Sequence, residues 1–286
     1  MRSIGQLIRD FNEFVMFKHT VFSLPFIFIA MIVAAGGWFG WRLLLLGLIA
    51  AVSARNFAMG VNRYLDRDID ALNPRTANRP SVDGRISQKA QIAFILINAA
   101  LFIAVAYMIN DLAFWLSFPI LLVLGGYSYF KRFSETAHLV LGVALGLAPI
   151  AGVVAVEGRI TMWSVFLALG VMFWVAGFDL LYSLQDMEFD KKMGLYSIPS
   201  RYGAGCTLFL SKVFHALAIL FWLLFVVEAK LGFFAYLAVL FAAVMLWYEH
   251  RIVHKDFTKI DRAFFTVNGY LGFVFLFLIV LDVVFR

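Results

Sequence analysis

A succession of apolar segments, each close to the length of a membrane-spanning helix, constrains this chain more than any other feature. The 286 residues are 63% apolar and only 15% charged, and roughly 20 apolar residues in a helix span the hydrocarbon core of a bilayer. The runs are long and continuous, without the short alternation that is typical of strands in a membrane barrel. The sequence therefore predicts an all-α integral membrane protein, not a soluble helical one.

Nine segments of this kind can be drawn along the chain. We expect them at roughly 14–36, 41–65, 89–109, 112–130, 138–156, 161–185, 205–227, 231–249 and 262–283. Lys18 interrupts the first segment, which is long and is followed by eight more, so a retained helix is predicted there instead of a signal peptide.

Basic residues are concentrated in every second loop. The N-terminus and the loops after the second, fourth, sixth and eighth segments carry clusters of arginine and lysine, whereas the alternate loops hold only Arg42, Arg159 and Lys230. Positively charged loops stay on the cytoplasmic side of a membrane. The sequence therefore predicts a multi-pass protein of the cytoplasmic (inner) membrane, with its N-terminus and its basic loops in the cytoplasm.

The stretch NRYLDRDID, residues 62–70, places charge where the second apolar segment ends. Asn62, Asp66 and Asp70 recur every four residues, and each such step advances about 40° around a helix, so one face carries all three. Asp68 lies on the opposite side. Two carboxylates one turn apart repel each other, and a divalent cation is the usual reason to tolerate them.

A second acidic stretch, DLLYSLQDMEFD, occupies residues 179–190. On a continuous helix Asp179, Tyr182, Asp186 and Asp190 fall within about 80° of arc. Asp186 follows Asp66 by 120 positions and four predicted helices, so the two stretches have the same orientation in the membrane. This predicts two pseudo-symmetric four-helix halves plus one helix, with the acidic ends directed toward a shared central cavity.

The residue types in these two stretches favour magnesium and a diphosphate. The chain has one cysteine and no paired-histidine motif, and hard carboxylate oxygens at this spacing suit magnesium, which is commonly bridged to substrate phosphates. Arginines gather beside both stretches, and their guanidinium groups match the geometry of phosphate oxygens. The sequence therefore predicts a metal–diphosphate site.

Four stretches together resemble the UbiA superfamily of intramembrane aromatic prenyltransferases. They are NRYLDRDID, RTANRP, YSYFKR and DLLYSLQDMEFD. The resemblance covers nearly the whole chain and implies a single domain over residues 1–286, with nine helices around a central cavity that opens sideways to lipid.

The resemblance also implies roles for individual residues. Asp66 and Asp70 would hold one magnesium ion and Asp186 and Asp190 the other, with a polyprenyl diphosphate bridging them. Further candidates for substrate binding are Asn62, which would support the first metal, and the basic residues Arg75, Arg79, Lys131, Arg132 and Lys18.

Asp179 and Tyr182 are candidates of a different kind. Asp179 lies two turns inside its predicted helix, where an ionisable group is costly without a partner or a role. It could accept the ring proton or orient the acceptor, or it could form a buried pair with Lys18, His19 or a residue of another helix. Tyr182 could hydrogen-bond Asp179 or simply pack.

The expected reaction is the magnesium-dependent transfer of a polyprenyl group to the ring carbon of an aromatic acid. The pattern most resembles the branch that prenylates 4-hydroxybenzoate for ubiquinone synthesis, and the alternative acceptor is 1,4-dihydroxy-6-naphthoate or a related naphthoate of menaquinone synthesis. Arg201 or Lys18 could meet the acceptor carboxylate. An ion-coupled transporter is the alternative of another class. No nucleic-acid partner and no obligate protein partner is expected.

Overall fold

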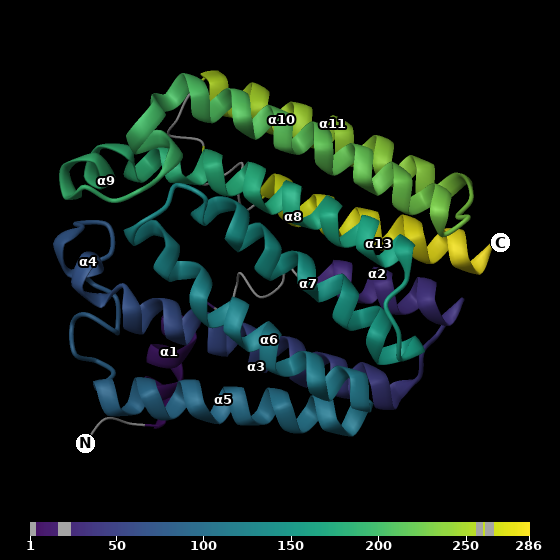
Figure 1. Cartoon of the computed structure of the whole chain (residues 1–286), viewed down its shortest axis with the longest axis horizontal. Helices are drawn as coiled ribbons and strands as arrows, with labels where there is room; N and C mark the ends of the chain where they lie inside the picture. Colours follow the sequence, from purple (N-terminus) through teal and green to yellow (C-terminus); the bar gives the residue numbers. More distant parts are fainter. Residues whose placement is uncertain (1–3, 17–23, 256–259, 261–265) are drawn as a thin grey trace. The chain divides into compact units, whose positions relative to one another are not determined.

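The structure is a computed structural model of the chain and describes residues 4–16, 24–255, 260 and 266–286. Within these ranges the chain forms helices and turns and no strand. Figure 1 shows the helices, which are α1 (Ile4–Val15), α2 (Leu24–Ala35), α3 (Trp41–Leu65), α4 (Arg67–Leu72), α5 (Gln88–Ile109), α6 (Asp111–Gly126), η2 (Tyr127–Arg132), α7 (Ala137–Glu157), α8 (Met162–Ser183), η3 (Leu184–Asp186), α9 (Met187–Met193), α10 (Ile198–Glu228), α11 (Phe233–Lys255) and α13 (Asn268–Val284).

Seven helical segments of the described chain are long and apolar enough to cross a membrane. They are α3, α5, α6 with η2, α7, α8 with η3 and α9, α10, and α11. The apolar helices α2 and α13 are shorter, and both adjoin residues outside the described ranges. The prediction of an all-α, multi-pass membrane protein is confirmed, whereas the count of nine spans and the symmetry of two halves stay predictions.

The first predicted span is wrong at its start. We expected one helix from residue 14, but α1 ends at Val15 and Met16 has a φ of 48°, which a right-handed helix does not contain. Hydropathy alone could not locate this break, because apolar residues lie on both sides of it. Lys18 lies outside the described residues.

The chain forms two compact units, which we describe separately. Unit 1 comprises Met1–Val21 and Leu45–Tyr129, and unit 2 comprises Phe22–Leu44 and Phe130–Arg286.

In unit 1, α3 approaches α5 closely because Gly60 has no side chain. A Cβ at Gly60 would lie 2.8 Å from Cγ1 of Ile95. The loop after α4 is tied to α1 through Arg85, whose guanidinium donates to the Glu13 carboxylate at 2.6 and 2.8 Å. The hydrogen bonds to Glu13 and, to a smaller extent, the hydrogen bond to Asp83 raise the pKa of Arg85 above its ordinary value. The basic loop between α4 and α5 is therefore fixed at its end.

In unit 2, α8 packs against both α7 and α10, and α13 packs against α2 and α11. The core contains a group of fully buried aromatic residues, Phe26, Trp174, Trp222, Phe225 and Phe275, among aliphatic ones. Figure 1 lets the reader follow α7, α8 and α10 as neighbouring helices along much of their length.

Two glycines bring α7 against α8. A Cβ at Gly142 would collide with the carbonyl oxygen of Met172, and one at Gly146 would lie 2.8 Å from that of Ala168. Small residues at four-residue spacing allow this close approach in membrane helices. We call the contact between Gly142, Gly146, Ala168 and Met172 the α7–α8 seam.

The seam gives a first prediction. Gly142→Ala is expected to destabilise the protein by roughly 1–3 kcal/mol, because the new methyl group meets backbone that cannot rotate away. Gly205→Ala in α10 is the matched control, since a Cβ there has no neighbour within 4 Å. Melting temperatures of both variants in the same detergent provide the test, and an equal effect of the two substitutions would contradict the seam.

Candidate active site

The first acidic stretch lies in unit 1, where α3 meets α4. Asp66 occupies the junction with φ −88° and ψ 4°. The backbone N–H of Asp66 donates to Asn62 O at 2.9 Å and that of Asp70 to Asp66 O at 2.7 Å, so the four-residue spacing passes through the junction. Asp66 is 2% exposed and Asp70 5% exposed. The two carboxylates are therefore buried one turn apart.

Each of these carboxylates has a polar partner from the predicted set. Asn62 Nδ2 donates to Asp66 Oδ2 at 3.0 Å, and Arg79 donates from one nitrogen to both oxygens of Asp70 at 2.7 Å. Arg75 is exposed, and its backbone N–H donates to Asn73 Oδ1. Arg79 thus lies at the acidic pair, whereas Arg75 lies at the surface of the loop.

Two arginines of α3 belong beside this site, and our sequence analysis did not single them out. Arg63 is 5% exposed, and the charges of Asp66 and Asp70 act on it. Arg55 is half-buried, and its buried Nε atom has no hydrogen-bond partner among the described residues. It precedes Asn62 by seven residues, which places both on one face of the helix. The sequence did contain the relevant feature, because an arginine inside an apolar span is costly and usually functional.

The second acidic stretch lies in unit 2 and is not one continuous helix. We expected residues 179–190 to share a single helical face, but α8 ends at Ser183, the 3₁₀ turn η3 follows, and α9 begins at Met187. A 3₁₀ turn has about 3.0 residues per turn instead of 3.6, so the positions of Asp186 and Asp190 around the axis shift relative to Asp179.

The aspartates at the two acidic junctions nevertheless have similar backbone angles. Asp186 precedes α9 with φ −100° and ψ 2°, close to the values of Asp66 before α4. Each of these aspartates directly precedes a short helix, and that helix carries a second aspartate four residues later. Hydropathy does not show the backbone conformation at these two aspartates. The sequence does show that each is followed by a second aspartate after four residues.

Asp190 is held by the loop that follows it. Ser197 Oγ donates to Asp190 Oδ2 at 2.9 Å, and the chain turns at Gly194, which has a φ of 67°. The backbone N–H of Tyr196 donates to the carbonyl of Lys131 at 2.9 Å. The basic end of η2, with Lys131 and Arg132, is thereby fixed beside the second acidic stretch.

Three further predicted residues of unit 2 have defined surroundings. Asp179 Oδ2 lies 2.7 Å from Nδ1 of His138 on α7, so Asp179 pairs with another helix. Tyr182 packs on the apolar cluster of Leu181 and Leu184. Arg201 is exposed, with its guanidinium carbon 4.1 Å from the centre of the Tyr196 ring.

The donor set of each junction fits magnesium. Each offers two carboxylates four residues apart, and magnesium is usually held by one or two carboxylates together with water and substrate oxygens. No group of three or more histidine, cysteine, aspartate or glutamate side chains is assembled for a metal in the described part of the chain. Each junction by itself therefore suits an ion that completes its coordination with a phosphorylated substrate.

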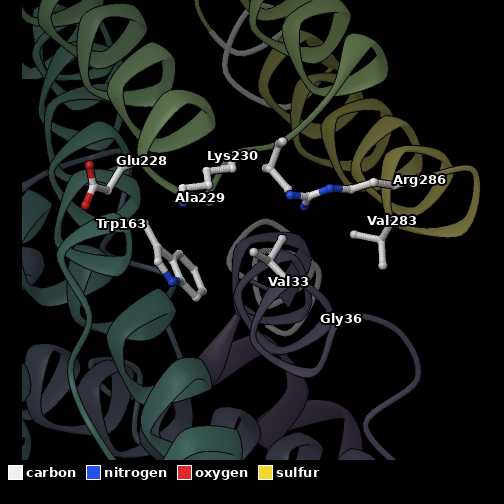
Figure 2. A pocket seen from close by; sticks show the side chains of 9 residues that line it. Val33, Gly36, Trp163, Glu228, Ala229, Lys230, Val283 and Arg286 are labelled. Atoms are coloured by element: carbon white, nitrogen blue, oxygen red, sulfur yellow. The ribbon is translucent and has the colours of Figure 1, made fainter.

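Unit 2 also contains a pocket of about 460 Å³ at the opposite end of its helices (Figure 2). Trp163, in the first turn of α8, lines it together with Lys230 and Arg286. The axis of α8 runs roughly 30 Å from Trp163 to Ser183. This pocket is therefore separate from the acidic junction.

A multi-pass helical membrane protein with two equivalent acidic helix junctions is the class that the fold and these motifs define. The chain belongs to the UbiA prenyltransferase family, which it matches over residues 23–279, and it is a membrane prenyltransferase.

Relatives and solved structures agree with this assignment. The chain is 27% identical over 259 residues to the 4-hydroxybenzoate octaprenyltransferase of Herminiimonas arsenicoxydans, covering 90% of both chains. It is 30% identical over 248 residues to that of Paracidovorax citrulli, covering 85% of this chain and 82% of the other. An apo UbiA homologue from Aeropyrum pernix superposes with a TM-score of 0.84 at 30% identity, over 92% of this chain and 98% of the other. A UbiA homologue from Archaeoglobus fulgidus bound to GPP and Mg²⁺ has the same fold, with a TM-score of 0.76 at 19% identity, over 95% and 99% of the chains.

Proposed function

We propose that the protein transfers a polyprenyl group from polyprenyl diphosphate to the ring carbon of 4-hydroxybenzoate, for ubiquinone synthesis. The observation that carries this proposal is the pair of acidic junctions at Asp66 and Asp186, which share one backbone geometry. The names of the curated relatives support the choice of acceptor.

In this proposal two magnesium ions, held by Asp66 with Asp70 and by Asp186 with Asp190, would neutralise the diphosphate as it leaves. Arg79, Lys131 and Arg132 would balance the negative charge of the diphosphate that the magnesium ions leave. The exposed Arg75 would bind the diphosphate from the loop. Arg79 donates to Asp70, so its guanidinium lies where a diphosphate held by a magnesium ion at that carboxylate would meet it. Its guanidinium links the acidic pair to the basic loop.

The finer architecture and location form part of the same proposal. A single domain of nine helices encloses a central cavity open to lipid, with the two junctions related by pseudo-symmetry of two halves. The matching backbone at Asp66 and Asp186 supports the symmetry. The protein lies in the inner membrane with the junctions on the cytoplasmic side, which the distribution of basic loops supports.

We assign to Arg55 the binding of the acceptor's carboxylate group. A carboxylate buried in a membrane protein needs a cationic partner, and Arg55 offers a buried Nε that no described residue uses. It shares the α3 face with Asn62. Arg201 is a weaker candidate because it is exposed and lies over Tyr196, and Lys18 lies outside the described residues. A naphthoate acceptor also carries a carboxylate, so Arg55 serves both alternatives.

The function is tested with purified protein, magnesium and a labelled polyprenyl diphosphate. The acceptors 4-hydroxybenzoate and 1,4-dihydroxy-6-naphthoate are offered in parallel. We expect prenylated 4-hydroxybenzoate, no product with excess EDTA, and recovery when magnesium is restored.

Product from the naphthoate alone would identify the alternative pathway. Failure to bind or cleave the diphosphate would contradict the enzyme assignment and favour the transporter.

A further inference from the structure

We propose that His138 is a positioning residue that holds Asp179 as the acceptor of the ring proton. This inference rests on the proposed function and adds a proton acceptor to it. The pair consists of His138, in the first turn of α7, and Asp179, near the end of α8. Both residues belong to unit 2.

The contact between the two side chains is short and unequally exposed. His138 Nδ1 lies 2.7 Å from Asp179 Oδ2, and the side chains are 7% and 24% exposed, respectively. Asp179 is therefore the member that a substrate can reach. His138 lies behind it and contacts the carboxylate through one oxygen.

The surroundings of the imidazole favour one arrangement of its hydrogen bonds. Nε2 of His138 is buried and has no hydrogen-bond partner among the described residues. A charged imidazolium would leave an N–H donor buried and unpaired there, which is costly. The neutral ring with its hydrogen on Nδ1 leaves only an unpaired acceptor at Nε2, and its Nδ1–H donates a hydrogen bond to Asp179. In this arrangement the Asp179 carboxylate accepts a hydrogen bond from His138 and has a second oxygen that can accept a proton.

The α7–α8 seam places the pair. His138, Gly142 and Gly146 follow one another at four-residue steps on α7, and Met172 and Asp179 are seven residues apart on α8, so each set shares one helix face. The glycines allow the backbones to touch. The His138–Asp179 contact is therefore an extension of a seam that fixes both backbones.

The pair also lies on the side of unit 2 that carries the acidic junction. His138 lies within electrostatic range of the Asp190 carboxylate, as do Asp186 and Lys131. A proton acceptor at Asp179 is thus in the electrostatic neighbourhood of the residues proposed to hold the diphosphate.

The chemical step requires one base and no further reactant. As the diphosphate leaves with the electron pair of its C–O bond, the acceptor ring forms a C–C bond to the prenyl carbon and becomes a cation. The C–H bond at the ring carbon that made this new bond then breaks, its electron pair restores aromaticity, and the proton passes to the Asp179 oxygen that His138 does not contact. His138 keeps the other oxygen occupied and so fixes the carboxylate for this transfer.

The test compares His138→Phe, which removes the donor, with His138→Asn, which keeps a donor near the position of Nδ1. We expect His138→Phe to lower kcat by about 10²-fold with little change in either KM, and His138→Asn to restore much of this loss. Acceptor deuterated at the reacting ring positions should show a primary isotope effect in His138→Phe that is absent from the wild type. His254→Gln, at an exposed histidine, is the control.

Unchanged kcat in His138→Phe, a rise in KM alone, or loss of activity without an isotope effect and without rescue by asparagine would overturn the proposal. Nitrogen-15 NMR of histidine-labelled wild-type protein gives a separate test that needs no substrate and no variant activity. The His138 resonances, assigned by their disappearance in His138→Asn, should indicate a neutral ring protonated on Nδ1, and an imidazolium would also overturn the proposal. A wild type that does not prenylate 4-hydroxybenzoate but has this tautomer would reject only the proposed acceptor.

Discussion

Replacing either Asp66 or Asp186 by alanine is expected to lower prenyl transfer by about 10³-fold or more, because each substitution removes a carboxylate that would hold the magnesium ion needed to stabilise the departing diphosphate. The two residues occupy equivalent backbone positions, so the two losses should be similar. Binding of magnesium in the presence of an unreactive diphosphate analogue, measured by calorimetry, should weaken in both variants.

The chain offers a matched control for each substitution. Asp68 lies in α4 and Glu188 in α9, both are exposed, and neither is in the proposed metal set. Asp68→Ala and Glu188→Ala should retain most of the activity. A similar loss in the controls would mean that the overall negative charge of the short helices matters, and that specific coordination by Asp66 and Asp186 is not required.

Much of the helical layout could be predicted because hydropathy determines it. The expected span 41–65 coincides with α3, and 89–109 differs from α5 by one residue. Polar residues end these helices at the point where the apolar run ends, so composition suffices. The break after Val15 and the 3₁₀ turn that ends at Asp186 were not predictable in this way, because hydropathy shows neither where a helix breaks nor where it changes to a 3₁₀ turn.

The candidate site shows the same division. The aspartate spacing is local, and it led directly to Asp66, Asp70, Asp186 and Asp190. The partner of Asp179 is 41 residues away in the sequence, and no periodicity connects the two positions. Long-range contacts of this kind require the packing of α7 on α8, which depends on the glycines of the seam.

Replacing Arg55 by methionine should raise the KM for 4-hydroxybenzoate by about 10²-fold, since a buried charge-assisted hydrogen bond is worth roughly 1.5–3 kcal/mol. Methionine has a similar length and keeps the packing of α3, so folding should be preserved. The KM for the polyprenyl diphosphate should stay close to that of the wild type. Arg42→Met, at an exposed arginine at the other end of α3, is the control.

A second acceptor makes this test specific to the carboxylate. With 4-hydroxybenzamide, which has no negative charge, the wild type already lacks the ion pair, so Arg55→Met should cause little further loss. Steady-state kinetics of both proteins with both acceptors then form a thermodynamic cycle, and its coupling energy measures the contact between Arg55 and the carboxylate. Equal losses with the two acceptors would show that Arg55 does not bind the acceptor carboxylate. Another cation would then have to bind it.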